Sequence, residues 1–282
     1  MEYRTEELDD IILAACNGDG SAMIWLAKYY ITKDIDPNSA KLWAHKAADS
    51  GIDEGNVVAR QVFSVLAIAD AELDEYELAY TEWMNVKWLA EDAQNRTTFS
   101  VREREKAEFD RLDSIFGGAY AYFMSDKYKE ALELLEKENI NLLCAGGPAS
   151  PYVTILHVLC QEESAREKER TGEISIEEHD AFLPQNLKSL DILDKNWECF
   201  NANKGRPDRS RILMIAAMTY ANYLRIFEND LRRAYSVLDR AEQAIEYEVF
   251  KEHLARVKKR YKKLCLVYIN TKKSREKDKY EL

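Results

Sequence analysis

The sequence predicts an all-α fold, and three observations support this. Apolar residues recur with helical spacing along nearly the whole chain of 282 residues. Its ten glycines and five prolines are few for a β-rich or α/β protein, which needs many turns, whereas long helices joined by short turns need few. Alanine, leucine, glutamate and lysine are abundant, and all four have high helix propensity. Sixteen Tyr, nine Phe and five Trp argue against disorder, because such a chain can bury a core.

Breaks in the apolar periodicity divide the chain into about twelve expected helices. They span residues 5–16, 20–32, 37–50, 54–71, 74–94, 99–125, 127–138, 150–170, 184–201, 208–228, 230–247 and 250–279. Ser21 is a candidate N-cap, and Asp36-Pro37 places a proline at the first position of a helix. We expect 171–185 to be a loop, and the Gly- and Pro-rich stretch 144–151 is the strongest interruption.

One segment carries a clear repeat pattern. It contains Ala15-x2-Gly18-x3-Ala22-x3-Leu26-Ala27-x2-Tyr30, followed by Ala40-x2-Trp43-x2-Lys46-Ala47-Ala48-x2-Gly51. This pattern resembles a Sel1-like repeat, with Ala27 in place of the usual glycine and Ala44 in place of the second aromatic residue. Small side chains would let the two helix backbones approach closely, and Leu26, Tyr30 and Trp43 would fill the seam.

A second pattern resembles the tetratricopeptide (TPR) repeat. Its small, aromatic and large positions are Ala119, Tyr122, Tyr128, Ala131 and Leu135, and a related pattern recurs at Ala221, Leu224, Ala234, Leu238 and Ala241. The two resemblances imply an α-solenoid, a right-handed superhelix of antiparallel helix pairs with a C-terminal capping helix. They imply Sel1-like repeats over 1–94 and TPR-like repeats over 95–282, with 251–279 forming the basic cap. Proteins of these families are usually adaptors, which implies a concave groove for a protein or peptide partner.

The groove of TPR-type units is lined by the first helix of each pair, on the side that faces away from the second. By register from Ala119 and Ala221, we expect the partner-binding groove to contain Phe116, Tyr120, Phe123, Met218, Asn222 and Arg225. Asparagine and arginine can hold the backbone or a carboxylate of an extended peptide. The alternative for Asn222 and Arg225 is an ordinary solvated helix face.

Charge is distributed unevenly along the chain. The net charge is −11, yet residues 251–282 carry twelve Lys or Arg and four Asp or Glu, giving +8, so the first 250 residues carry −19. The basic cluster consists of Arg256, Lys258, Lys259, Arg260, Lys262 and Lys263. A helix that caps the last repeat and complements an acidic body is one interpretation. The other is a surface that binds nucleic acid or another polyanion.

Motifs for catalysis, metal binding and nucleotide binding are absent from the sequence. The four histidines form no metal-binding motif, and the Gly-Gly pairs match neither a P-loop nor a dinucleotide fingerprint. His157 and Cys160 could share a helix face, but their apolar surroundings favour a core cysteine over a nucleophile. We therefore predict a non-enzymatic protein without metal or cofactor.

The compartment and the class of partner follow from weaker signals. The five cysteines form no CxxC pair, the first residues are acidic and polar, and no run of 18 apolar residues occurs. We expect a cytoplasmic protein that binds a protein or peptide and no membrane, with nucleic acid as the second choice. A peptide-sensing regulator, an immunity-type inhibitor and an assembly adaptor all fit, and the sequence leaves the oligomeric state open.

Overall fold

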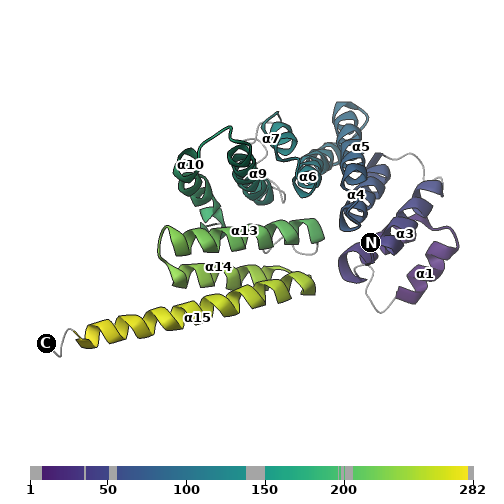
Figure 1. Cartoon of the computed structure of the whole chain (residues 1–282). Coiled ribbons are helices and arrows are strands. Elements are labelled where there is room, and N and C mark those ends of the chain that lie inside the picture. The colour runs from purple at the N-terminus through teal and green to yellow at the C-terminus, as the bar shows by residue number, and fades with distance from the viewer. Residues whose placement is uncertain are drawn as a thin grey trace. The chain divides into compact units, whose positions relative to one another are not determined.

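All regular elements of the described chain are helices (Figure 1). The computed structural model describes residues 8–34, 36–50, 56–137, 150–195, 197, 200 and 206–278, with side chains as far as Leu264. No strand occurs within these ranges, so the all-α prediction is confirmed. The chain forms two compact units. The first is Met1–Cys160 with Arg206–Asp208, and the second is Gln161–Gly205 with Arg209–Leu282.

Consecutive helices of the first unit pack against one another. Its elements are α1 (Leu8–Cys16), α2 (Gly20–Tyr29), the π-helical turn η2 (Tyr30–Asp34), α3 (Pro37–Asp49), α4 (Asn56–Glu72), α5 (Tyr76–Asn95), α6 (Val101–Met124), α7 (Tyr128–Lys137) and the first part of α9 (Ser150–Thr171). Each helix from α1 to α6 contacts the next. Helix α2 also contacts α4, and α4 also contacts α6. Such packing of neighbours is compatible with a helical repeat.

Short polar side chains set the helix starts. The Asp19 carboxylate accepts hydrogen bonds from the backbone N–H groups of Ser21, at 2.9 Å, and Ala22, at 3.1 Å. Asp19 is thus the N-cap of α2, and the prediction of Ser21 is wrong because the helix begins earlier, at Gly20. Asp36 caps α3 with Pro37 at the first helical position, as predicted.

Small residues form the seam between α2 and α3. Ala22, Ala27, Ala40 and Ala47 are all buried together with Leu26, as the repeat pattern predicts. Trp43 and Tyr30 are half-buried and pack against the same apolar cluster. These positions therefore have the burial that close packing of two helices requires.

A glycine in the middle of α6 allows close approach of α5. A Cβ atom placed on Gly117 would lie 2.1 Å from the Trp83 ring, which is fully buried. The guanidinium of Arg206 lies over the same ring, 5.2 Å from the ring centre, and pairs with Asp113 and Asp208. Helices α5 and α6 thus pack tightly on both sides of residue 94, where we expect the two repeat types to meet within one continuous superhelix.

The second unit contains a helix that the sequence did not predict. Its elements are the rest of α9, α10 (Ile176–Lys188), the 3₁₀ turn η3 (Ser189–Asp191), α11 (Ile192–Lys195), most of α13 (Pro207–Ile226), α14 (Leu231–Ala244) and α15 (Glu248–Asp278). The expected loop at 171–185 is wrong, because Ser175 and Glu178 form a capping box that starts α10. The helix expected over 184–201 is also wrong, since α10 includes Pro184 and ends at Lys188.

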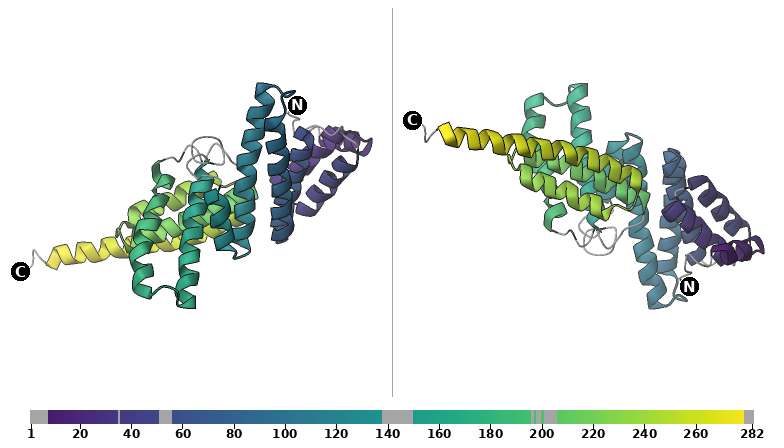
Figure 2. Two further views of the ribbon diagram at one scale, coloured as in Figure 1. Left: turned by 90° about the horizontal axis from the view of Figure 1, so that it is seen from above. Right: turned by 90° about the horizontal axis from the view of Figure 1, so that it is seen from below.

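Helix α14 packs against α15, and α15 extends beyond α13 and α14 (Figures 1 and 2). Arg211 of α13 lies over the Phe250 ring of α15, 5.4 Å from the ring centre. The stretch 144–149, most of the strongest interruption in the sequence, lies outside the described residues, as does 201–205.

Candidate partner-binding site

The three aromatic residues of α6 that we expected in a groove are buried. Phe116 and Tyr120 have 0% exposure, and Phe123 is also buried. The Phe116 ring lies 6.1 Å from the ring of Tyr152 on α9, and the Phe123 ring lies 5.6 Å from that of Tyr128 on α7. Helices from later in the chain therefore cover this side of α6. The expectation that these side chains face an open groove is wrong.

Two of the three predicted groove residues of α13, Asn222 and Arg225, contact α15. Met218 is half-buried, whereas Asn222 and Arg225 are exposed. The Asn222 Oδ1 accepts a hydrogen bond of 2.8 Å from the hydroxyl of Tyr261, a buried residue of α15. Burial raises the pKa of Tyr261, and its hydrogen bond with Arg225 opposes that rise. The chain's own last helix thus contacts two of the residues that we assigned to a partner.

The basic cluster of α15 contains one structural residue and five exposed ones. Lys258 pairs with two carboxylates of α14, Asp239 at 2.7 Å and Glu242 at a shorter distance, which fixes α15 against α14. The other members are exposed, and within the described part of the chain none of them forms an ion pair: Arg256, Lys259, Arg260, Lys262 and Lys263. Both interpretations of this helix, cap and polyanion surface, therefore have residues that fit them.

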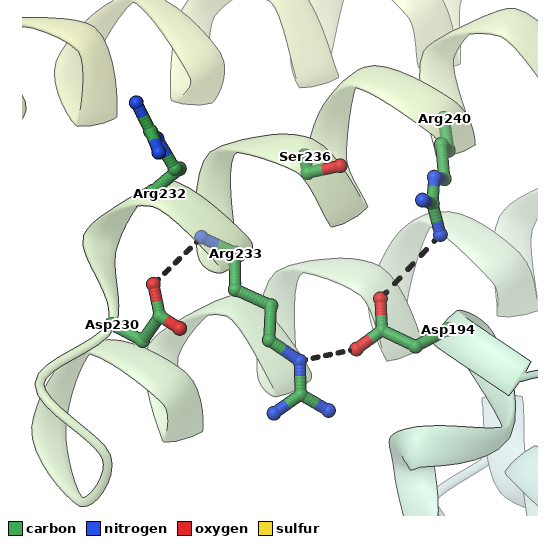
Figure 3. Close-up of a pocket in the computed structure, with 6 residues that line it drawn as sticks. All are labelled: Asp194, Asp230, Arg232, Arg233, Ser236 and Arg240. Atoms are coloured by element: carbon green, nitrogen blue, oxygen red, sulfur yellow. Dashed lines mark hydrogen bonds and ion pairs between the residues drawn. The ribbon is translucent and has the colours of Figure 1, made fainter.

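A cavity of about 430 Å³ lies beside α14 (Figure 3). Its lining consists of Asp194, Asp230, Arg232, Arg233, Ser236 and Arg240. Five of these residues belong to α14 or cap it, and Asp194 comes from α11. The Asp230 carboxylate accepts a hydrogen bond from the backbone N–H of Arg233 at 2.9 Å, so it caps α14.

One arginine of this pocket donates a hydrogen bond from each of its three guanidinium nitrogens. Arg233 donates from Nε to Asp194 Oδ2 at 2.6 Å, from Nη1 to Glu228 at 2.9 Å and from Nη2 to the Tyr220 hydroxyl at 2.7 Å. The Tyr220 hydroxyl in turn lies 3.4 Å from Asp194 Oδ2, and burial raises the pKa of Tyr220. Because all three nitrogens have acceptors, Arg233 and Asp194 form a fixed wall of the pocket.

Three other polar side chains of α14 have no hydrogen-bond acceptor among the described residues. They are Arg232, Ser236 and Arg240, which follow one another at intervals of four positions and hence lie along one side of the helix. Arg240 Nη1 lies 3.6 Å from Asp194 Oδ1, an ion pair too long for a hydrogen bond. We call these three residues the α14 stripe.

Sequence reasoning missed this pocket entirely. The spacing of Arg232, Ser236 and Arg240 after the capping residue Asp230 is visible in the sequence and could have marked one face of a helix. The contact of Arg233 with Asp194, across 39 positions, could not be predicted because Asp194 lies where we expected the middle of a continuous helix.

Two histidines lie in acidic surroundings. His157 Nε2 is 3.6 Å from Glu136, and burial lowers its pKa, while Cys160 is wholly buried, as expected for a core cysteine. His179 of α10, expected in a loop, is buried, and its Nδ1 lies 2.5 Å from Glu169 on α9. Across the ranges that the structure describes, no three histidine, cysteine or acidic side chains are grouped so that they could hold a metal ion.

Comparison of the chain with protein-family models, with curated proteins and with solved structures finds no significant match. The resemblance to Sel1-like and TPR repeats thus rests on the residues quoted above and on the packing of adjacent helices. Among the described helices, none combines the length and the apolar character needed to cross a bilayer.

Proposed function

We propose that this chain is a non-enzymatic scaffold of TPR- or Sel1-like helix pairs, stacked as a right-handed superhelix, which binds a protein or peptide partner in the cytoplasm. The contacts of α2 with α4 and of α4 with α6 carry this proposal, because alternate helices touch when successive pairs stack. Burial of the small residues at the repeat positions, such as Ala40, Ala119 and Ala131, adds support.

The partner surface that fits best is the pocket beside α14 and not the aromatic face of α6. Phe116 and Tyr120 have 0% exposure, whereas the pocket is open and contains polar donors that have no acceptor in the part of the chain that the structure describes. Stacked helix pairs present a rigid surface, so a partner segment can bind such donors with little reordering of the scaffold.

Affinity capture followed by reconstitution tests the scaffold function. The tagged full chain is used to capture proteins from its native lysate, with and without nuclease, and the dominant captured protein is then purified and titrated against the chain by calorimetry. We expect saturable binding that nuclease does not alter. A one-to-one complex with a folded partner would favour the inhibitor function. Binding of a short segment would favour a sensor or an adaptor. If no captured protein binds after purification, the scaffold function is wrong.

Binding of a polyanion by α15 is the second candidate. The observation in its favour is the exposed set Arg256, Lys259, Arg260, Lys262 and Lys263, which no acidic side chain among the described residues neutralises. Filter binding of duplex DNA and RNA over a range of salt concentrations tests it, because each neutralised phosphate steepens the salt dependence. Loss of retention in R256Q/R260Q would support this candidate. Retention no greater than that of an acidic control protein would exclude it.

A further inference from the structure

We propose that the α14 stripe, Arg232, Ser236 and Arg240, binds an acidic segment of the partner through two of that segment's carboxylates. This inference rests on the proposed scaffold function and specifies the chemistry of the partner. Two arginines and a hydroxyl that have no hydrogen-bond acceptor among the described residues lie along one helix beside an open pocket, and their donors match carboxylate oxygens (Figure 3).

The pocket contains one arginine that is held by hydrogen bonds and another that is available to a partner. Arg233 holds Asp194 by a hydrogen bond of 2.6 Å and is itself held by Glu228 and Tyr220. Arg240, in contrast, lies 3.6 Å from Asp194 and forms no hydrogen bond with a described residue, so its guanidinium N–H groups can donate to a carboxylate of the partner. The ion pair with Asp194 places the Arg240 guanidinium at the pocket (Figure 3).

The spacing of the stripe sets the spacing of the carboxylates. Arg232 and Arg240 are eight positions apart, which corresponds to about 12 Å along a helix axis. An extended peptide covers about 3.3–3.6 Å per residue, so two acidic residues roughly four positions apart can reach both guanidinium groups. Ser236 lies between the two arginines, where its hydroxyl can bond the peptide backbone.

The acidic residues of the pocket favour a peptide over a nucleic acid. Asp194 and Asp230 line the same cavity as the three arginines. A continuous phosphate backbone would pass close to these carboxylates, and like charges in proximity cost binding energy. A peptide can place its two carboxylates at the arginines and uncharged residues between them.

Fluorescence anisotropy with a defined probe tests the inference on the full chain. The probe is a fluorescein-labelled Gly/Ser peptide with two glutamates about four positions apart, measured at about 50 mM NaCl because surface charges are less screened there. Its matched peptide carries glutamines, a third carries phosphoserines and a single-stranded DNA serves as competitor. R232Q/R240Q is compared with R256Q/R260Q, which removes the same charge from α15.

We expect R232Q/R240Q to weaken binding of the glutamate peptide at least about tenfold, because two charge-assisted contacts are lost. R256Q/R260Q should bind like the wild type, and the glutamine peptide should not bind. Five outcomes would each overturn the inference. Both variants could lose binding equally, or the glutamine peptide could bind as well as the glutamate peptide. The phosphoserine peptide alone could bind, the DNA could displace the glutamate peptide, or no peptide could bind saturably. Because the stripe side chains make no hydrogen bond with described residues, R232Q/R240Q should fold normally, which circular dichroism verifies.

The partner obtained for the scaffold test separates the two proposals. If it binds the wild type and R232Q/R240Q equally, the scaffold function stands and the acidic-segment inference is wrong. If no purified partner binds either protein, the scaffold function itself is wrong.

Discussion

Tyr261 of α15 donates a hydrogen bond to Asn222 of α13, with 2.8 Å between the two oxygen atoms. Tyr261 is buried although Asn222 is exposed, so α15 lies over the edge of the α13 face that carries Asn222. The repeat pattern alone places Asn222 in an open groove. The structure shows that the basic C-terminal helix contacts this face, whereas Arg232, Ser236 and Arg240 of α14 form no hydrogen bond with a described residue.

Removing the Tyr261 hydroxyl should lower stability slightly. Y261F keeps the ring in its buried site but loses the hydrogen bond with Asn222, and a typical intramolecular hydrogen bond contributes about 1 kcal/mol. Urea denaturation of Y261F, N222A and the double variant measures this. The double variant should be about as unstable as either single variant. Independent, additive losses would show that the two side chains do not interact.

Replacing Asp110 should lower the free energy of unfolding far more than replacing an acid at the surface. Arg60 has 1% exposure, its Nε bonds Asp110 at 2.7 Å, and its two Nη atoms have no acceptor in the described part of the chain. D110N leaves this buried charge without its acid, which costs about 3–5 kcal/mol for buried pairs. D92N breaks the pair with Arg96, in which the arginine is exposed and the acid half-buried, and should cost about 1 kcal/mol or less. Similar unfolding free energies for both variants would contradict the burial of Arg60.

Gly117 and Gly118 should respond differently to alanine. A Cβ on Gly117 would lie 2.1 Å from the buried Trp83 ring, whereas one on Gly118 would meet the flexible end of Met84 at 2.9 Å. G117A should destabilise the protein by about 2 kcal/mol or more, through overpacking that exceeds the gain of about 1 kcal/mol in helix propensity. G118A should cost less, because Met84 can move. Thermal unfolding of both variants checks the order, and a G117A protein as stable as the wild type would contradict the close approach of α5 and α6.

The pH dependence of stability should show the effect of the raised pKa of Asp70. This carboxyl is buried beside Lys41, with 2.6 Å between Nζ and Oδ1, and burial raises its pKa despite that partner. The folded protein therefore binds this proton more tightly than the unfolded chain does. The contribution of Asp70 to stability is greatest below its unfolded pKa of about 4 and is lost as pH rises through the higher folded pKa.

Comparison of the wild type with D70N isolates this contribution, because the two proteins have all other carboxyl groups in common. The free energy of unfolding of D70N relative to the wild type should rise with pH across this range, as measured by urea denaturation at successive pH values. A difference between the two proteins that stays constant with pH would show that the pKa of Asp70 is not raised by folding.

Local signals in the sequence predicted most of the helices. Asp36-Pro37 marks a helix start by itself, and Ala22, Ala27 and Leu26 show by their spacing which side of a helix is buried. Helix α10 was missed because Pro184 and a run of acids suggested a loop, although the Ser175–Glu178 capping box was available as a signal.

The candidate site was harder to predict, since it depends on contacts between distant parts of the chain. The burial of Phe116 follows from its packing against Tyr152 on a later helix, which helical register within α6 cannot reveal. The pocket likewise requires Asp194 to meet Arg233 and Arg240. Sequence periodicity specifies which side of a helix is apolar, but not which later helix covers it.

Calorimetric titration of the purified partner against the wild type, R232Q/R240Q and R256Q/R260Q is the most direct test of the scaffold function. We predict saturable binding to the wild type, binding at least about tenfold weaker to R232Q/R240Q and unchanged binding to R256Q/R260Q. If no partner captured after nuclease treatment binds the wild type, a protein-binding scaffold is the wrong function for this chain.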